Sequence, residues 1–229
     1  MAEAQKQQRV LAIGAHPDDT EVGCGGTVAK LAQQGWEITY IVCTNGNKGS
    51  HDPSMDIYRL SALREQEQQA AAAALGVQRV IFLRYNDGEL EPTPALRLEL
   101  ALYVRHFKPH AVYTHDPWRR YMLHPDHRAV GFAVIEGLVS ARDHLYLPGL
   151  EQIGYPVWRP EYLYLWSADD PDYTEDIGAT LELKLEALAQ HHSQIEAGST
   201  FVERMRQRSL DQGQSAGFAA GEAFRRIRL

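Results

Sequence analysis

The chain has 229 residues, of which 44% are hydrophobic and 23% are charged, and its formal net charge is −7 at pH 7. This length and composition predict one globular domain spanning residues 1–229 and exclude the disordered and fibrous classes. The negative net charge argues against binding to nucleic acid, because recognition of a phosphate backbone requires a basic face.

No stretch of the sequence resembles a targeting or membrane-spanning segment. The N-terminal residues MAEAQKQQRV lack the apolar core of a secretory signal, and no stretch approaches the ~18 apolar residues that a membrane span needs. We therefore expect no membrane span and a cytoplasmic location. The two cysteines, Cys24 and Cys43, lack the spacing of a metal site and are expected to be small, partly buried thiols, so any metal would be bound by His and carboxylate side chains.

Short apolar runs alternate along the chain with longer helical patterns. The helical pattern in residues 61–76 ends at Gly76, which is typical of a helix C-cap. This alternation predicts an α/β, Rossmann-like fold, in which a mostly parallel sheet carries helices on both faces. In the C-terminal third we expect extra helices, with the arginine-rich stretches ERMRQRSL and FRRIRL on a terminal helix with a solvated face. The runs that predict strands are residues 9–15, 37–44, 79–84, 110–115 and 161–166.

Three polar loops are longer than simple connections, and each follows a predicted strand. They comprise residues 44–56, 85–94 and 115–126. In open α/β sheets the ligand site lies outside the carboxyl ends of the strands, so we expect these loops to gather at one edge of the sheet.

The sequence HPDD, residues 16–19, begins where the first predicted strand ends. His16 and Asp19 are three residues apart, so a helical turn would place their side chains on one face. Asp18 lies between them, points in a different direction and could act on whatever that pair binds. Pro17 stiffens the turn and removes one backbone donor.

A second cluster, HPDH at residues 124–127, repeats this arrangement. Pro125 suits the first position of a helix, His124 would cap that helix, and His127 follows three residues later. Either cluster alone is also typical of helix-capping residues. Together they can share one ion, because a catalytic zinc site takes three protein ligands from His and carboxylate side chains. The set of His16, Asp19 and His127 would meet that requirement.

The chain resembles the LmbE-like, or PIG-L, family of zinc-dependent N-deacetylases. The resemblance rests on AHPDDTEVGCGGT near the start, HPDHRAVG in the middle, LREQEQQAAAAALG and NDGEL between them, and HHSQ and GEAFRRI toward the end. It therefore extends over nearly the whole chain and implies the LmbE-like fold. Thr20 follows the second Asp where many members have Glu, and Glu21 comes one position later, which we interpret as a subfamily mark.

The resemblance implies a role for each residue of the two motifs. His16, Asp19 and His127 would bind Zn²⁺, or another divalent metal such as Fe²⁺, and Asp18 would be the general base. His124 would polarise the substrate carbonyl or protonate the leaving amine, and Asp126 would orient that histidine.

The protonation state of His124 is left open by the sequence. A helix N-terminus lowers the pKa of a nearby imidazole, so a cationic His124 would need an opposing carboxylate, either Asp126 or Asp116. Alternatively, His124 acts as a neutral donor.

The resemblance further implies a substrate and its contacts. The protein would be a hydrolase that removes the acetyl group from an N-acetylglucosamine-type glycoside or a similar small N-acetyl sugar, giving acetate and a free amine. We also expect a homo-oligomer, because related enzymes often assemble. The expected substrate-binding residues are Arg64, Asp87, Tyr121 and His191, and Trp118 and Tyr58 are further candidates for stacking on the sugar.

Two other functions are compatible with parts of the sequence. The stretch VGCGGT looks like the glycine loop of a nucleotide-cofactor enzyme such as a methyltransferase. However, its glycines come after HPDDTE rather than directly after the strand, and G-x-G-x-x-G is not completed. They would instead let a helix approach the sheet or the backbone approach a substrate. A non-catalytic sugar or metal binder on the same scaffold is the second alternative, although it has no need for Asp18 beside three ligands.

Overall fold

The computed structural model describes residues 7–195 and 199–229. Its sheet has the strand order β3-β2-β1-β4-β5-β7-β6. The strands are β1 (Arg9–Gly14), β2 (Glu37–Thr44), β3 (Arg79–Tyr85), β4 (Ala111–His115), β5 (Tyr162–Trp166), β6 (Tyr173–Asp176) and β7 (Gly221–Arg228). The helices are α1 (Asp19–Gln33), α2 (Ile57–Ala74), α3 (Pro94–Phe107), α4 (Pro125–Arg142), α5 (Leu181–Leu188) and α6 (Phe201–Ala216), with a short 3₁₀ turn at Leu150–Ile153.

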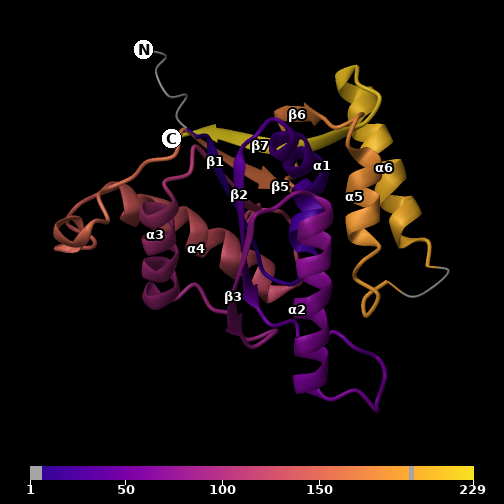
Figure 1. The fold of residues 1–229 in the computed structure, drawn as a ribbon, viewed down its shortest axis with the longest axis horizontal. Helices are drawn as coiled ribbons and strands as arrows, with labels where there is room; N and C mark the ends of the chain where they lie inside the picture. The colour runs from indigo at the N-terminus through magenta and orange to yellow at the C-terminus, as the bar shows by residue number, and fades with distance from the viewer. Residues whose placement is uncertain (1–6, 196–198) are drawn as a thin grey trace.

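The sheet is mostly parallel and is covered by helices on both faces. Strands β1 to β5 pair in parallel, whereas β7 pairs antiparallel with β5 and β6 pairs antiparallel with β7. Figure 1 shows α3 and α4 on one side of the sheet and α1, α2, α5 and α6 on the other. The predicted Rossmann-like α/β architecture is confirmed.

The central strand β1 is apolar along its length because both of its faces are buried. Leu11 and Ile13 contribute to the core under α3 and α4, whereas Val10 and Ala12 contribute to the core under α1 and α2. A parallel strand enclosed in this way reads as a continuous apolar run rather than as an alternating one. Its burial fixes the position from which the HPDD turn emerges.

The strand order reverses between β1 and β4. From β1 the chain builds outward through β2 and β3, and it then crosses to the other side of β1 to form β4. The loops that follow β1 and β4 therefore diverge, and such a switch point is where open α/β sheets bind their ligands. The three predicted polar loops follow β2, β3 and β4, as expected.

The glycines of VGCGGT lie inside α1, where they permit close packing. A Cβ atom on Gly23 would lie 2.7 Å from Cγ of Trp166, and one on Gly26 would lie 2.7 Å from Cδ1 of Ile177. The helix is also interrupted at Cys24, whose backbone is not helical (φ −148°). These contacts agree with the expectation that the glycines let a helix approach its neighbours.

The prediction for the C-terminal third was partly wrong. The stretch ERMRQRSL lies in α6 as expected, but FRRIRL lies in β7 rather than on a helix. Residue pairs such as Trp166 with Phe224 and Leu163 with Ile227 add β7 to the edge of β5. The strand conformation of β7 depends on this pairing with β5, which is distant in the sequence. The local sequence pattern of FRRIRL does not reveal such pairing.

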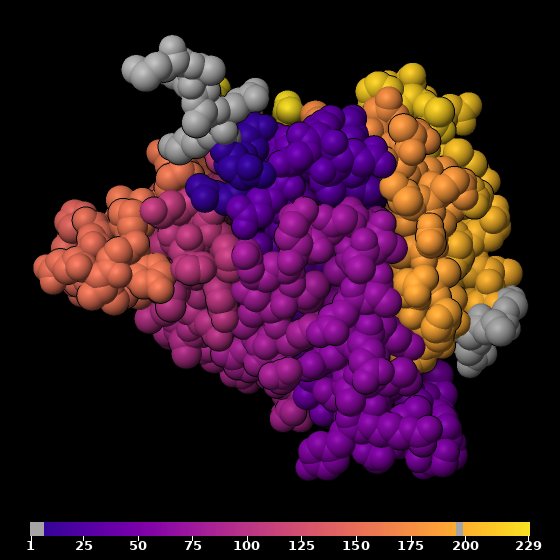
Figure 2. Space-filling view, in the orientation of Figure 1, coloured from indigo at the N-terminus to yellow at the C-terminus, as the bar shows by residue number. Residues whose placement is uncertain are grey.

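The segment between α4 and β5 projects from the surface. Figure 2 shows the orange residues between α4 and β5 standing out from the body of the molecule, and Leu145 and Ile153 in this segment are exposed. Among the described residues, no helix combines the length and the apolar character needed to cross a membrane. The expected homo-oligomer stays a prediction.

We expect Gly23→Ala to destabilise the protein, although alanine normally favours a helix by about 1 kcal/mol. The new methyl group would overlap the buried Trp166 ring, and overpacking of this kind costs about 1–3 kcal/mol. Chemical denaturation of both proteins measures the difference in the free energy of unfolding. Gly25→Ala is the matched control, because its methyl group would meet the Lys184 Cγ at 3.3 Å and cost less. A Gly23→Ala protein as stable as the parent would contradict this packing argument.

Candidate metal centre and active site

The turn after β1 brings His16 and Asp19 together at the carboxyl edge of the sheet. The Asp19 amide donates to the His16 carbonyl at 3.3 Å, and the His16 amide donates to Asp19 Oδ2 at 2.7 Å. Both side chains are buried. The turn therefore holds an imidazole and a carboxylate side by side at the start of α1.

The second motif places His127 against this pair. His124 occupies the N-cap position of α4 and Pro125 follows at the start of the helix, so His127 lies within its first turn. His127 Nε2 lies 3.2 Å from His16 Nδ1 and 3.3 Å from Asp19 Oδ1, while Asp19 Oδ2 lies 3.4 Å from His16 Nδ1. The side chains of the three predicted metal ligands thus come together from two distant segments.

The spacing of these atoms fits a metal ion. Zinc binds His nitrogen and carboxylate oxygen at about 2.0–2.1 Å in tetrahedral geometry, for which neighbouring ligand atoms are about 3.3 Å apart. Two separations, 3.2 Å from His127 Nε2 to His16 Nδ1 and 3.3 Å from His127 Nε2 to Asp19 Oδ1, match that value, while the 3.4 Å separation joins His16 Nδ1 to the other oxygen of Asp19. Two imidazoles and one carboxylate are also the donor set of several catalytic zinc sites.

Two further carboxylates hold the far side of the His16 ring. His16 Nε2 lies 3.0 Å from Asp87 Oδ1 and 3.1 Å from Asp126 Oδ2. A carboxylate on the second nitrogen fixes the tautomer of a metal-binding histidine and leaves the first nitrogen free for the metal. Asp87 lies against His16 in this structure, and its expected contact with the substrate stays a prediction.

The Asp126 carboxylate makes hydrogen bonds to His16 and to a neighbouring loop, and its expected orienting of His124 stays a prediction. Besides His16, its carboxylate accepts hydrogen bonds from the backbone amides of Gly88 at 2.7 Å and Leu90 at 3.1 Å. Within the described part of the chain, its hydrogen bonds therefore orient His16 and the loop after β3, rather than His124. Spacing in the HPDH motif could not reveal this, because the Asp126 side chain turns toward a loop from another part of the chain.

His115, at the end of β4, was missed by the sequence analysis. Its Nδ1 accepts from Trp166 Nε1 at 3.1 Å, so its Nε2 carries the ring hydrogen, and that nitrogen lies 3.2 Å from Asp19 Oδ2. The ring also stacks on that of His127, with centroids 4.3 Å apart. The sequence signal that could have identified His115 is its position at the carboxyl end of β4, the strand beside β1.

The charged neighbours shift the pKa values of the ligands in opposite directions. Burial lowers the pKa of His16, but its hydrogen bonds to surrounding carboxylates outweigh burial and raise the pKa well above its usual value. Burial raises the pKa of Asp19, whereas His127 and His115 lower it, and it ends well below the usual value. These shifts favour an ionised Asp19 and a protonated His16 in the metal-free protein.

Asp18 is strained. Its φ of 108° and ψ of −27° lie in a region that costs a non-glycine residue about 1–3 kcal/mol. Burial raises the pKa of its carboxyl group, and the positive charge of Arg64, whose Nη2 donates to Asp18 Oδ2 at 3.1 Å, opposes that rise. A carboxylate with a raised pKa, next to the metal ligands and not among them, is suited to accept a proton.

His124 is neutral at pH 7 in the metal-free protein. Burial lowers its pKa, and the positive charges of His16 and His127 lower it further, against the opposing effect of nearby carboxylates. Of the two carboxylates suggested by the sequence, Asp126 raises the pKa of His124, whereas Asp116 Oδ1 accepts a hydrogen bond from the Trp118 amide. The neutral-donor alternative for His124 is therefore favoured.

The remaining predicted substrate residues lie in different surroundings. Arg64 is buried behind Asp18, and His191 is fully buried with its Nε2 3.4 Å from Glu21 Oε2. Tyr121 is 93% exposed on the loop before α4, and Trp118 is also largely exposed there. Substrate contact by any of these side chains stays a prediction.

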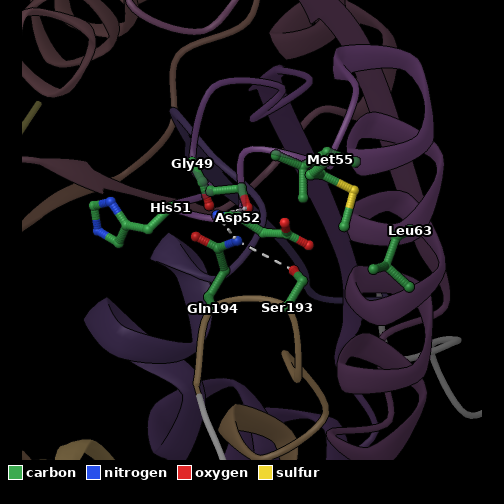
Figure 3. Close-up of a pocket in the computed structure, with 9 residues that line it drawn as sticks. Gly49, His51, Asp52, Met55, Leu63, Ser193 and Gln194 are labelled. Carbon is green, nitrogen blue, oxygen red and sulfur yellow. Dashed lines mark hydrogen bonds between the residues drawn. The ribbon is translucent and has the colours of Figure 1, made fainter.

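A cavity of about 510 Å³ lies between the loop after β2, α2 and the segment after α5. Figure 3 shows Gly49, Asp52, Ser193 and Gln194 around it. Its polar groups largely satisfy one another: Gln194 Nε2 donates to the Gly49 carbonyl at 2.9 Å and to Ser193 Oγ at 3.1 Å. The predicted site residues are absent from its lining, so the cavity is separate from the histidine cluster.

Comparison with known proteins identifies relatives along most of the chain. Residues 11–138 match the family model PIG-L, described as GlcNAc-PI de-N-acetylase. Diacetylchitobiose deacetylase of Thermococcus kodakarensis is 34% identical over 193 residues, covering 82% of this chain and 70% of that protein. The 1D-myo-inositol 2-acetamido-2-deoxy-alpha-D-glucopyranoside deacetylase of Rhodococcus erythropolis is 30% identical over 240 residues, covering 82% of this chain and 81% of that protein.

The solved structures agree with this relationship. N,N'-diacetylchitobiose deacetylase from Pyrococcus horikoshii superposes with a TM-score of 0.92 at 32% identity, covering 98% of this chain and 85% of that one. The resemblance inferred from the HPDD and HPDH motifs is thereby confirmed. By its sequence, its fold and its relatives, the chain belongs to the PIG-L family of deacetylases.

Proposed function

We propose that this protein is a metal-dependent hydrolase that removes the acetyl group from an N-acetylglucosamine-type glycoside or a similar small N-acetyl sugar. The observation that carries the proposal is the approach of His16, Asp19 and His127 to one another at 3.2 to 3.4 Å, with Asp18 directly before Asp19 at the start of α1. The deacetylases among its relatives support the substrate class.

Zinc is the metal we propose, with Fe²⁺ as the alternative. His16, Asp19 and His127 would hold it, and Asp87, Asp126 and His115 would orient these ligands. When bound, a divalent metal polarises a carbonyl oxygen and lowers the pKa of water to about 7.

The chain's own residues would then perform the proton transfers and the positioning. Asp18 accepts a proton from the attacking water, whose oxygen adds to the acetamide carbon. His124, being neutral, donates a hydrogen bond to the oxygen on which negative charge develops. When the C–N bond breaks, the proton held by Asp18 passes to the nitrogen, so that acetate and a free amine leave.

Acetate release tests the proposal directly. The zinc-loaded protein would be incubated with diacetylchitobiose and with inositol and malate glycosides of N-acetylglucosamine, beside a sample from which a chelator has removed the metal. We expect release from at least one glycoside, its loss on chelation and its return with added zinc. Absence of release from every glycoside, with zinc bound, would favour the non-catalytic binder.

We expect Asp18→Asn to lower kcat about 10²–10⁴-fold, because general-base catalysis contributes that much. The zinc content should not change, since Asp18 is not one of the three ligands. Asp52→Asn, which makes the same change at an exposed loop position, is the control and should retain activity. Normal turnover by Asp18→Asn would show that another group takes the proton.

We expect zinc binding to release a proton from His16 at neutral pH. The raised pKa of His16 means that its ring is protonated in the metal-free protein, and a metal ligand must be deprotonated. The apparent zinc affinity should therefore rise with pH until the pH passes the pKa of His16. Calorimetry in buffers of different ionisation enthalpy counts the protons released, and Asp126→Asn should release fewer. A zinc affinity that is constant between about pH 6 and pH 8 would contradict this expectation.

A further inference from the structure

The conformation of Asp18 requires an explanation, because it is held far from the usual backbone regions. Strained residues of this kind persist only where surrounding groups determine their geometry, and they gather at functional sites. The contacts that restrain Asp18 come from α2, which begins 39 positions later in the chain at Ile57.

Helix α2 holds the peptide group between Pro17 and Asp18 at both of its polar atoms. Arg64 Nη2 donates to the Pro17 carbonyl at 2.6 Å, and Gln68 Oε1 accepts from the Asp18 amide at 2.9 Å. Arg64 and Gln68 are four residues apart, so they lie on the same face of the helix. Fixing this peptide plane restrains the φ angle of Asp18, which is the rotation about the next bond.

Gln68 can do this only if its amide presents oxygen to Asp18. Its Nε2 donates to Glu21 Oε1 at 2.8 Å. A carboxylate accepts hydrogen bonds, so Glu21 selects this orientation of the amide and excludes the flipped one. Glu21 Oε2 in turn accepts from Thr20 Oγ1 at 3.1 Å, and His191 Nε2 lies 3.4 Å from it. The side chains of Gln68, Glu21 and His191 are all fully buried.

We propose that Gln68 and Glu21 are positioning residues, which hold the Asp18 backbone so that its carboxylate is directed at the metal centre. This inference rests on the proposed function, in which Asp18 is the general base. It assigns a role to Glu21, which lies one position later than the Glu of many family members, because Glu21 in α1 accepts a hydrogen bond from Gln68 in α2. It also accounts for the burial of His191, which packs against Glu21 rather than facing an open site.

Gln68→Leu tests the proposal, because it removes both hydrogen bonds and keeps a similar volume. We expect kcat to fall about 10²-fold, which is the usual cost of misplacing a catalytic group by about 1 Å. The KM and the zinc affinity, measured by competition with a chromogenic chelator, should change little, because the metal ligands are not touched. Gln69→Leu makes the same change on the exposed face of α2 and should behave like the parent protein.

An exchange of the two side chains separates positioning from general stability. Gln68→Glu alone would bury two carboxylates against each other and should be poorly active. The double variant Glu21→Gln/Gln68→Glu restores the pattern, because the new carboxylate accepts from both the Asp18 amide and the new amide. We expect its kcat to recover at least about tenfold over Gln68→Glu. A Gln68→Leu protein with parental kcat, or a loss of kcat that follows zinc affinity and is not rescued by the exchange, would overturn the proposal.

A crystal structure of zinc-loaded Gln68→Leu decides the same question without substrate. We expect φ of Asp18 to leave the positive region or the carboxylate to turn away from the metal centre, whereas an unchanged Asp18 would overturn the positioning role. If the parent protein releases no acetate from any glycoside, the proposed function fails, and this structure still reports whether α2 determines the Asp18 conformation.

Discussion

The parallel pairing of β1 with β4 is the constraint on which the site depends. Ile13 lies opposite Thr114, and Thr114 Oγ1 also donates to the Ile13 carbonyl at 2.8 Å. Because β1 and β4 are parallel neighbours, their carboxyl ends lie at the same edge of the sheet. The turn carrying His16 and the loop leading to His127 therefore begin beside each other. A shift of one residue in this register would displace His115 and the HPDD turn relative to each other, and the 3.2 Å approach of His16 to His127 would be lost.

Charge balance supports a cation at this position. Asp19, Asp87 and Asp126 all contact His16, and Asp18 lies in the same turn. Burial opposes ionisation of each of these carboxyl groups, yet the pKa of Asp87 is lowered to about 2 by its hydrogen bond to His16. Arg64 and a protonated His16 offset part of this negative charge in the metal-free protein. A bound divalent ion would offset more of it, which would let carboxylates be concentrated in so small a volume.

The sequence predicted those features that local pattern controls. Apolar runs identified β1 to β5, and the position of HPDD and HPDH relative to the strands predicted that the two motifs lie together, because the carboxyl ends of parallel strands share one edge. What it missed depends on contacts between distant segments. Strand β7 forms by pairing with β5, and Asp126 turns toward His16 rather than His124. Gln68 of α2 accepts a hydrogen bond from the Asp18 amide at the start of α1. Side-chain direction in such contacts is set by tertiary packing, which spacing along the chain does not encode.

The central claim is that His16, Asp19 and His127 together bind one metal ion, and zinc X-ray absorption spectroscopy tests it most directly. The zinc-loaded protein should contain one zinc per chain, with nitrogen and oxygen neighbours at about 2.0–2.1 Å and outer-shell scattering from two imidazoles. The scattering from imidazole should decrease in His127→Ala. A shell of sulfur at about 2.3 Å, which would require the buried Cys24 or Cys43, or a zinc environment unchanged in His127→Ala, would contradict the account.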